Sequence, residues 1–185
     1  MLRNLAFAAA VVAQVATITY LYAEPAWTMT HGQVVTLQTK PVDPYDMFRG
    51  EYAQLGYDFE QPAPAHLHLQ PDQVVYAVLS KTKNNWKLVN YSKTKPISAA
   101  GQIVLRGHAD SPWSAASRGS SFGDHGVNFG IERLYLPEGQ SRDLQFRGKA
   151  LKVEVAVNTA GQALIKRVFD GDKLIYDGTR VALGF

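Results

Sequence analysis

The sequence predicts a mostly β fold: a barrel- or sandwich-like antiparallel domain preceded by one N-terminal transmembrane helix. Two observations predict it. One is an uncharged apolar stretch near the N-terminus, and the other is a succession of short β-branched or alternating segments separated by Gly, Asn, Asp and Pro. The 185 residues suffice for one domain and a short appendage. We therefore expect an anchor at residues 1–26 and an extracytoplasmic β domain at residues 27–185.

The amino-acid composition excludes several classes of protein. Hydrophobic residues make up 46% of the chain and charged residues 19%, which argues against disorder and against a coiled coil. The absence of cysteine excludes a disulfide scaffold, a Cys-ligated metal site and a cysteine nucleophile. The net charge of +3 is well short of a nucleic-acid-binding signature, so no nucleic-acid partner is expected.

The predicted anchor is residues 5–23, LAFAAAVVAQVATITYLYA. As a helix this stretch is ~28 Å long, close to the ~30 Å of a bilayer's hydrocarbon core, so membrane lipid is its expected partner. Arg3 precedes it and Glu24 is the first charge after it, which favours a cytoplasmic N-terminus and a C-terminal domain in a periplasm or lumen. Pro25 is expected to end the helix. Aromatic residues typical of the headgroup zone cluster at the exit: Tyr20, Tyr22 and Trp27.

Two other interpretations of this stretch stay open. The first is a cleaved signal peptide, which requires small residues at positions −3 and −1. Cleavage after Ala23 would put Leu21 at −3, which is unfavourable, whereas cleavage after Ala26 satisfies both positions but leaves Pro25 between them. The second is a buried helix of a soluble domain. We favour an uncleaved anchor.

The first strands follow the anchor. The turn at His31-Gly32 leads into a β-branched run at residues 33–39, which predicts a strand. Residues 52–59 alternate, and their apolar members share one face: Ala53, Leu55, Tyr57 and Phe59. Residues 61–72 hold three prolines and predict an extended linker rather than a helix.

An apolar run at residues 73–79 predicts a central strand, which pairs through an Asn84-Asn85 turn with residues 86–91. Residues 101–106 predict another strand, and the Ser- and Gly-rich residues 109–126 predict a mobile loop. The C-terminal third predicts a β-meander. Its expected segments are an ordered stretch at 128–136, a short helix at 140–149, and strands at 150–157, 163–168 and 173–176.

A resemblance to a known family rests on two separated motifs. Residues 50–57, GEYAQLGY, resemble the signature of the GDYXXLXY protein family, with Glu51 where the family usually has Asp. The preceding VDPYDMFR, the downstream FGIERLYLPEG at residues 129–139 and the segment 150–157 are similar too, so that the resemblance covers most of residues 33–178. It implies a bacterial, membrane-anchored protein of undefined biochemical role, and it carries over no catalytic residue.

The motif strand is the first of two candidate binding surfaces. Its charged and aromatic members would form a ligand or partner site together with Asp58. The structural alternative is that its apolar members fill the core of the β domain and its charges anchor the turn. The candidate binding residues of this strand are Arg49, Gly50, Glu51, Tyr52, Leu55 and Tyr57.

The second surface is a basic lobe, residues 73–109, which carries +6 while the rest of the chain carries −3. Its basic side chains are Lys81, Lys83, Lys87, Lys93, Lys95 and Arg106, with Trp86 and Tyr91 between them. The expected partners are anionic headgroups or other membrane proteins with acidic surfaces. The alternative is a solvated hairpin whose lysines prevent edge-to-edge pairing. The candidate binding residues are Lys81, Lys83, Trp86 and Lys87.

Signals of catalysis or metal binding are weak. The Gly-acidic-Tyr strand is also similar to one in type I signal peptidases, but no serine precedes Gly50 to act as their nucleophile. No P-loop, dinucleotide fingerprint, Gly-x-Ser-x-Gly or His-Glu-x-x-His occurs. His66 and His68 share one face of an extended chain, but they lie in the Pro-rich linker, so we expect a solvated pair, no metal site and no cofactor.

These observations favour a single-span, membrane-anchored accessory or interaction protein that is non-catalytic and associates with other membrane components. The alternative is an extracytoplasmic domain that binds a small molecule or glycan through Tyr52, Trp86 and Trp113. A membrane-anchored hydrolase is the third hypothesis.

Overall fold

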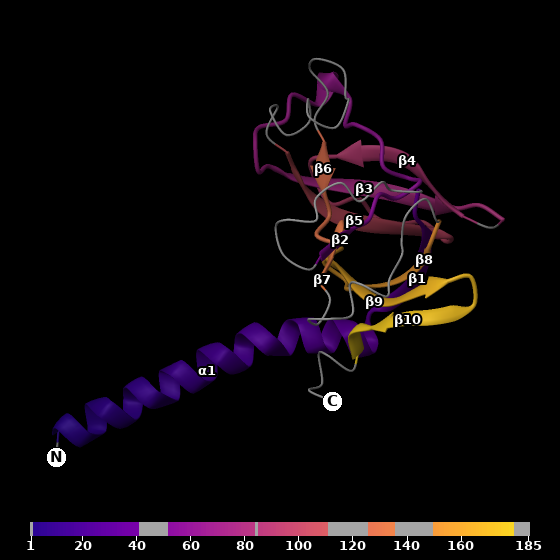
Figure 1. Ribbon diagram of the computed structural model, residues 1–185. Helices are drawn as coiled ribbons and strands as arrows, with labels where there is room; N and C mark the ends of the chain where they lie inside the picture. Colours follow the sequence, from indigo (N-terminus) through magenta and orange to yellow (C-terminus); the bar gives the residue numbers. More distant parts are fainter. Residues whose placement is uncertain (1, 41–51, 84, 111–125, 136–149, 180–185) are drawn as a thin grey trace.

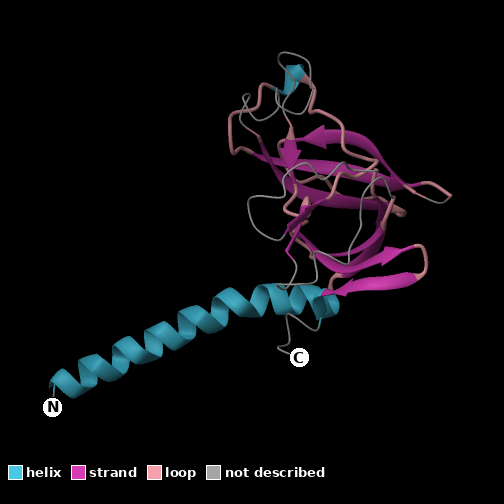
Figure 2. Cartoon of the chain, viewed as in Figure 1, coloured by secondary structure: helices cyan, strands magenta, loops and turns pink. Residues whose placement is uncertain are grey.

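The computed structural model describes residues 2–40, 52–83, 85–110, 126–135 and 150–179. One long apolar helix leads into two four-stranded antiparallel sheets that pack in a sandwich-like arrangement (Figures 1 and 2). The first sheet lies beside the end of the helix and the second sheet lies farther from it. This confirms the predicted mostly β fold with one N-terminal helix.

The helix α1 spans Leu2–His31, so the prediction that Pro25 ends it was wrong. Proline removes one backbone N–H, but the turn that follows continues, and the Thr28 and Thr30 hydroxyls donate to the carbonyls of Glu24 and Ala26. The helix ends instead at Gly32, whose N–H donates to the Thr28 carbonyl at 2.8 Å. A Cβ at Gly32 would lie 2.5 Å from that oxygen, so only glycine fits this junction.

The helix α1 is long and apolar enough to cross a membrane, counting residues Ala6–His31. The same length and composition are typical of a signal sequence near an N-terminus. Its 30 residues correspond to ~45 Å. Its contacts with the β domain include β8 and β9 of the first sheet, and Thr28 near its end is buried.

The first sheet has the order β1-β8-β9-β10 and is antiparallel throughout. Its strands are β1 (Gln33–Gln38), β8 (Lys152–Val157), β9 (Ala163–Asp170) and β10 (Lys173–Asp177). The predicted C-terminal meander is thereby confirmed. The chain reverses between β8 and β9 at Gly161, which has φ +89°, and the Arg106 N–H donates to its carbonyl at 2.7 Å. This contact joins the turn of the first sheet to the second sheet.

The second sheet has the order β4-β3-β5-β6. Its strands are β3 (Val74–Lys81), β4 (Trp86–Ser92), β5 (Gln102–Ala109) and β6 (Val127–Asn128). The apolar strand β3 lies between β4 and β5, as its composition predicted, and β3 and β4 form the predicted hairpin. The predicted loop falls mostly within 111–125 and the predicted short helix within 136–149, so both lie outside the described residues.

A short pair of strands, β2 (Tyr52–Gln54) and β7 (Arg133–Tyr135), completes the β structure that is described. The strand predicted for residues 52–59 is therefore shorter, because the chain leaves β7 after Gln54 and Tyr57 bridges to Thr39 at the end of β1. Alternate residues still face the core as predicted, since Leu55, Tyr57 and Phe59 are buried. The linker after it is not an α-helix, as predicted, but it is not extended throughout, because it contains a 3-10 turn at Ala65–Leu67 and a turn at 71–72.

The hydrophobic core lies between the two sheets and includes the motif segment. Its fully buried large side chains are Leu37, Tyr57, Val75, Leu79, Leu105, Ile131, Leu134, Val153, Val155 and Val168. They come from both sheets and from the segments on either side of β2 and β7. Residues of both sequence motifs, Leu55 and Tyr57 of the first and Ile131 and Leu134 of the second, thus belong to the core.

Candidate functional site

The two sequence motifs lie side by side. The strands β2 and β7 pair in register from Tyr52 opposite Tyr135 to Gln54 opposite Arg133. Beyond the strand, the Leu55 N–H donates to the Glu132 carbonyl at 2.7 Å, and the Tyr57 hydroxyl donates to the Ile131 carbonyl at 2.8 Å. The two motifs therefore bind each other, which favours the structural interpretation of the signature.

Tyr57 is the centre of this contact. Its side chain is completely buried, and its ring stacks on Phe59 with centroids 5.7 Å apart. Burial raises the pKa of the Tyr57 phenol well above its usual range, and the nearby Glu132 and Glu60 carboxylates raise it further. The phenol is therefore a neutral hydrogen-bond donor that satisfies a backbone carbonyl.

The other predicted residues of the motif strand are not brought to one surface by the described structure. Arg49, Gly50 and Glu51 lie outside the described residues, and for Tyr52 the backbone alone is described, in β2. Leu55 is 4% exposed, so like Tyr57 it faces the core. A ligand site on this strand stays a prediction. Asp58 is exposed and accepts a hydrogen bond from the Asn85 amide at 3.1 Å.

The basic lobe divides into three parts in the folded chain. Lys81, Lys83 and Lys87 are exposed at the turn end of the β3–β4 hairpin. The ammonium groups of Lys93 and Lys95 donate to the carbonyls of His68 and Thr159. Arg106 lies on β5, outside the hairpin.

The aromatic residues of the lobe face inward. Trp86 and Tyr91 are buried in the core, and the Tyr91 hydroxyl donates to the Gln61 carbonyl at 2.7 Å. Burial raises the pKa of this phenol, and the Glu60 carboxylate raises it further. Since Trp86 is buried and Trp113 lies outside the described residues, the predicted glycan or small-molecule site around them stays a prediction.

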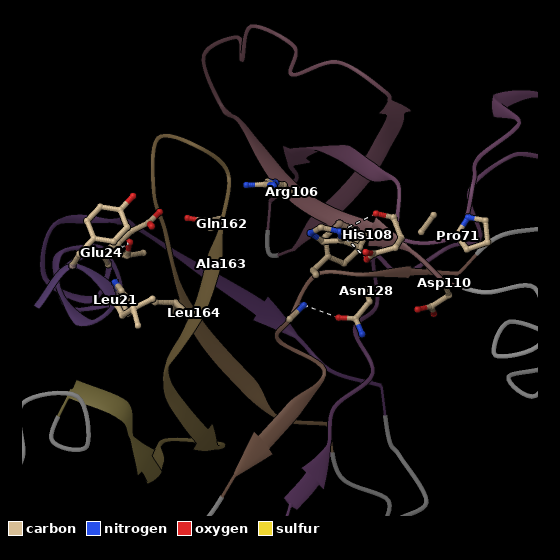
Figure 3. A pocket seen from close by; sticks show the side chains of 17 residues that line it. Leu21, Glu24, Pro71, Arg106, His108, Asp110, Asn128, Gln162, Ala163 and Leu164 are labelled. Carbon is tan, nitrogen blue, oxygen red and sulfur yellow. Dashed lines mark hydrogen bonds and ion pairs between the residues drawn. The ribbon is translucent and has the colours of Figure 1, made fainter. Parts of the chain in front are cut away.

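A cleft of about 820 Å³ separates the last turns of α1 from the β domain (Figure 3). In Figure 3, Leu21 and Glu24 of α1 lie on one side, His108, Asp110 and Asn128 lie on the other, and Arg106 and Gln162 lie between them. Sequence reasoning missed this cleft because its walls come from five separate segments. They are residues 20–28, 71–72, 106–110, 128–130 and 162–164.

The cleft carries opposite charges. The Nε atom of Arg106 is buried and has no hydrogen-bond partner in the described part of the chain. Glu24 on the helix is exposed and makes one long contact, 3.5 Å from the Asn158 amide. At the other end, the Asp72 carboxylate lies 3.2 Å from Nδ1 of His108. The arrangement can bind a ligand that carries both charges.

One backbone group adds to the acceptors on the helix wall. Pro25 has no N–H, so the Leu21 carbonyl lacks the donor that an α-helix normally supplies four residues later. Leu21, Glu24 and Pro25 all line the cleft. This carbonyl and the Glu24 carboxylate therefore offer acceptors on the same stretch of α1.

The predicted histidine pair is not part of a metal-binding group in the portion of the chain that the structure describes. His66 lies in the 3-10 turn and His68 follows it with φ 44°. Among the described residues, no group of three or more His, Asp or Glu side chains is placed to hold a metal ion.

Comparison with known proteins gives one match. The family model described as "GDYXXLXY protein" matches residues 14–168, which is most of the chain and includes both motifs, the strands β1 to β8 and most of β9. No curated protein and no solved structure matches.

Proposed function

The chain belongs to the GDYXXLXY family, whose role is undefined. From that premise we propose that it is a single-span membrane protein. We propose that its β domain lies outside the cytoplasm and serves there as a non-catalytic accessory module. The observation that supports this most is the projection of α1 away from the β domain (Figure 1). The described side chains from Asn4 to Pro25 are all exposed.

An apolar helix that projects in this way is unfavourable in water. Phe7, Val12, Tyr20 and Leu21 are 63–74% exposed, and each such side chain gains roughly 1.5–3 kcal/mol on leaving water. The ~45 Å of α1 match a bilayer with its headgroups, about 40–45 Å thick. Lipid around residues 5–23 is therefore the environment that this helix fits, with Arg3 on the cytoplasmic side.

The geometry of the cleft supports binding rather than catalysis. Its ionisable pair, His108 and Asp72, has side chains that are 46% and 93% exposed. Catalytic acids and bases usually lie in a buried or strongly polarising environment. Solvent surrounds both groups of this pair and screens their interaction.

For the basic hairpin the structure favours one of the two predicted partners. In Figure 1 the turn between β3 and β4 lies beyond the end of α1, on the side of the molecule opposite the N-terminus. If α1 is in the bilayer, Lys81, Lys83 and Lys87 point away from the headgroups of that bilayer. We therefore propose an acidic surface of another membrane protein as their partner.

The topology can be tested with single cysteines, because the chain has none of its own. We expect Lys83→Cys to react with a membrane-impermeant maleimide in intact spheroplasts, and Asn4→Cys to react only after permeabilisation. Intact mass should show the full 20.4 kDa chain. A mature chain beginning near Glu24 or Trp27, or labelling of Asn4→Cys from outside, would contradict the proposed topology.

The partner of the basic hairpin can be tested by placing a photo-crosslinking amino acid at Lys83 in membranes. We expect one discrete protein adduct that weakens at high salt, because screening reduces the attraction of exposed charges. The matched control is the same amino acid at Leu174, which is 45% exposed on β10. Lys81→Glu with Lys87→Glu should abolish the adduct, and an adduct that survives this reversal, or a lipid adduct alone, would contradict the proposed partner.

A further inference from the structure

The cleft lies at the depth where the helix would leave the bilayer. If residues 5–23 span the hydrocarbon core, the five residues 24–28 rise ~7.5 Å beyond it. The headgroup zone on each side is about 5–8 Å deep. The helix wall of the cleft, from Tyr20 to Thr28, therefore extends from the end of the hydrocarbon into the headgroups. This placement depends on the proposed function.

The domain wall of the cleft offers a cation. The guanidinium of Arg106 has a buried Nε without a partner, and in the described part of the chain it has no ion pair. Guanidinium binds phosphate through charge-assisted, often bidentate hydrogen bonds. The buried Nε of Arg106 has lost its contact with water and has gained no hydrogen bond in return. A phosphate in the cleft would supply that hydrogen bond.

The helix wall offers two acceptors beside the Tyr20 phenol, which can donate. Glu24 supplies a carboxylate, and Leu21 supplies the carbonyl that Pro25 leaves without its usual donor. A primary ammonium group donates to both, whereas a quaternary ammonium has no N–H to donate. A ligand with phosphate alone would place its negative charge opposite Glu24.

Part of the cleft lining is apolar, on both walls. Leu21 and Pro25 lie on α1, and Ala163 and Leu164 lie on β9. Acyl chains are the part of an amphiphile that fits beside these side chains. The cleft of about 820 Å³ is large enough for a headgroup and the first part of its chains.

From these four features we propose that the cleft binds phosphatidylethanolamine from the surrounding bilayer, with its phosphate on Arg106 and its primary amine on Glu24 and the Leu21 carbonyl. The lipid fills the space between α1 and the β domain and so links the orientation of the domain to the membrane surface.

The test uses the full chain in nanodiscs of phosphatidylcholine with one fifth phosphatidylethanolamine or phosphatidylglycerol. Native mass spectrometry reports which lipid stays bound when the disc is stripped. We expect phosphatidylethanolamine to be retained at least about tenfold over the other two lipids, since one charged hydrogen bond of roughly 1.5–3 kcal/mol corresponds to 10- to 100-fold. Glu24→Gln should remove this preference, whereas Arg106→Gln should weaken the retention of all three lipids, because each of them carries a phosphate.

The controls change the same charges elsewhere. Lys152→Gln and Asp172→Asn alter an exposed pair on the first sheet, 3.7 Å apart, and should keep the preference. Circular dichroism checks that every variant keeps its strand content. Equal retention of phosphatidylglycerol, loss of the preference in a control variant, or no retained lipid would overturn the inference.

Two further outcomes separate the hypotheses. A chain that does not enter the nanodiscs would contradict the proposed function itself, whereas a chain that enters them and retains no phosphatidylethanolamine contradicts the lipid site alone. Binding of free phosphoethanolamine in discs of pure phosphatidylcholine, without retention of the lipid, would overturn the bilayer as the source of the ligand.

Discussion

Tyr57→Ala is expected to lower the free energy of unfolding by about 4 kcal/mol or more, since truncating a large buried aromatic usually costs about 3–5 kcal/mol. The substitution leaves a cavity beside Phe59 and also removes the hydroxyl that donates to the Ile131 carbonyl. That carbonyl would then lack its donor in the core. Thermal unfolding of the full chain in mild detergent, followed by circular dichroism, measures the loss.

The matched control is Tyr76→Ala. Tyr76 lies on β3 and is only partly buried, so its truncation should lower stability much less. If both variants unfold at the same temperature, Tyr57 does not support the core, and the structural interpretation of the family signature fails.

Tyr57→Phe separates the hydrogen bond from the cavity. It keeps most of the volume and should cost about 1–2 kcal/mol at neutral pH, where a lost hydrogen bond leaves a buried acceptor unpaired. The folded-state pKa of Tyr57 is raised, so its contribution is complete below pH ~10 and is lost as pH rises from there. The stability gap between wild type and Tyr57→Phe should therefore shrink above pH ~10, and a gap that widens would contradict the assigned environment.

Local patterns predicted the strands well because each strand's alternation and its flanking turns are encoded within a few residues. The meander β8-β9-β10 and the hairpin β3-β4 follow directly from such patterns. The pairing of β1 with β8 does not, since Val35 lies opposite Val155, far along the chain. Alternation shows which face is apolar, but not which distant strand it meets.

The same limit applies to two features that depend on distant parts of the chain. Counting charges along residues 73–109 predicted one basic lobe, but the reversal between β4 and β5 separates Arg106 from the lysines of the hairpin turn. The prediction that Pro25 ends the helix considered the missing N–H alone, while the packing of Thr28 against the β domain favours one more turn. Both features needed the assembled fold.

Val12→Arg with Val15→Arg is expected to release the protein from the membrane. These residues are 67% and 57% exposed near the middle of the predicted span, and each charge at the centre of a spanning helix costs about 2.5–3.5 kcal/mol, or ~6 kcal/mol together. Insertion of a single short apolar helix does not withstand that loss. Alkaline carbonate extraction and flotation of membranes measure how much of the chain stays bound.

The control adds the same two charges to the β domain, as Val34→Arg with Leu174→Arg, at positions that are each 45% exposed. Because these side chains belong to the β domain and not to the predicted span, this variant should stay with the membrane, which excludes a general effect of net charge. If the variant with arginines in α1 also floats with the membrane and resists carbonate, the helix is not the anchoring element. In that case the surface of the β domain must hold the protein to the membrane. The basic hairpin is then the first element to examine, because the attraction between anionic headgroups and each lysine is worth about 1 kcal/mol.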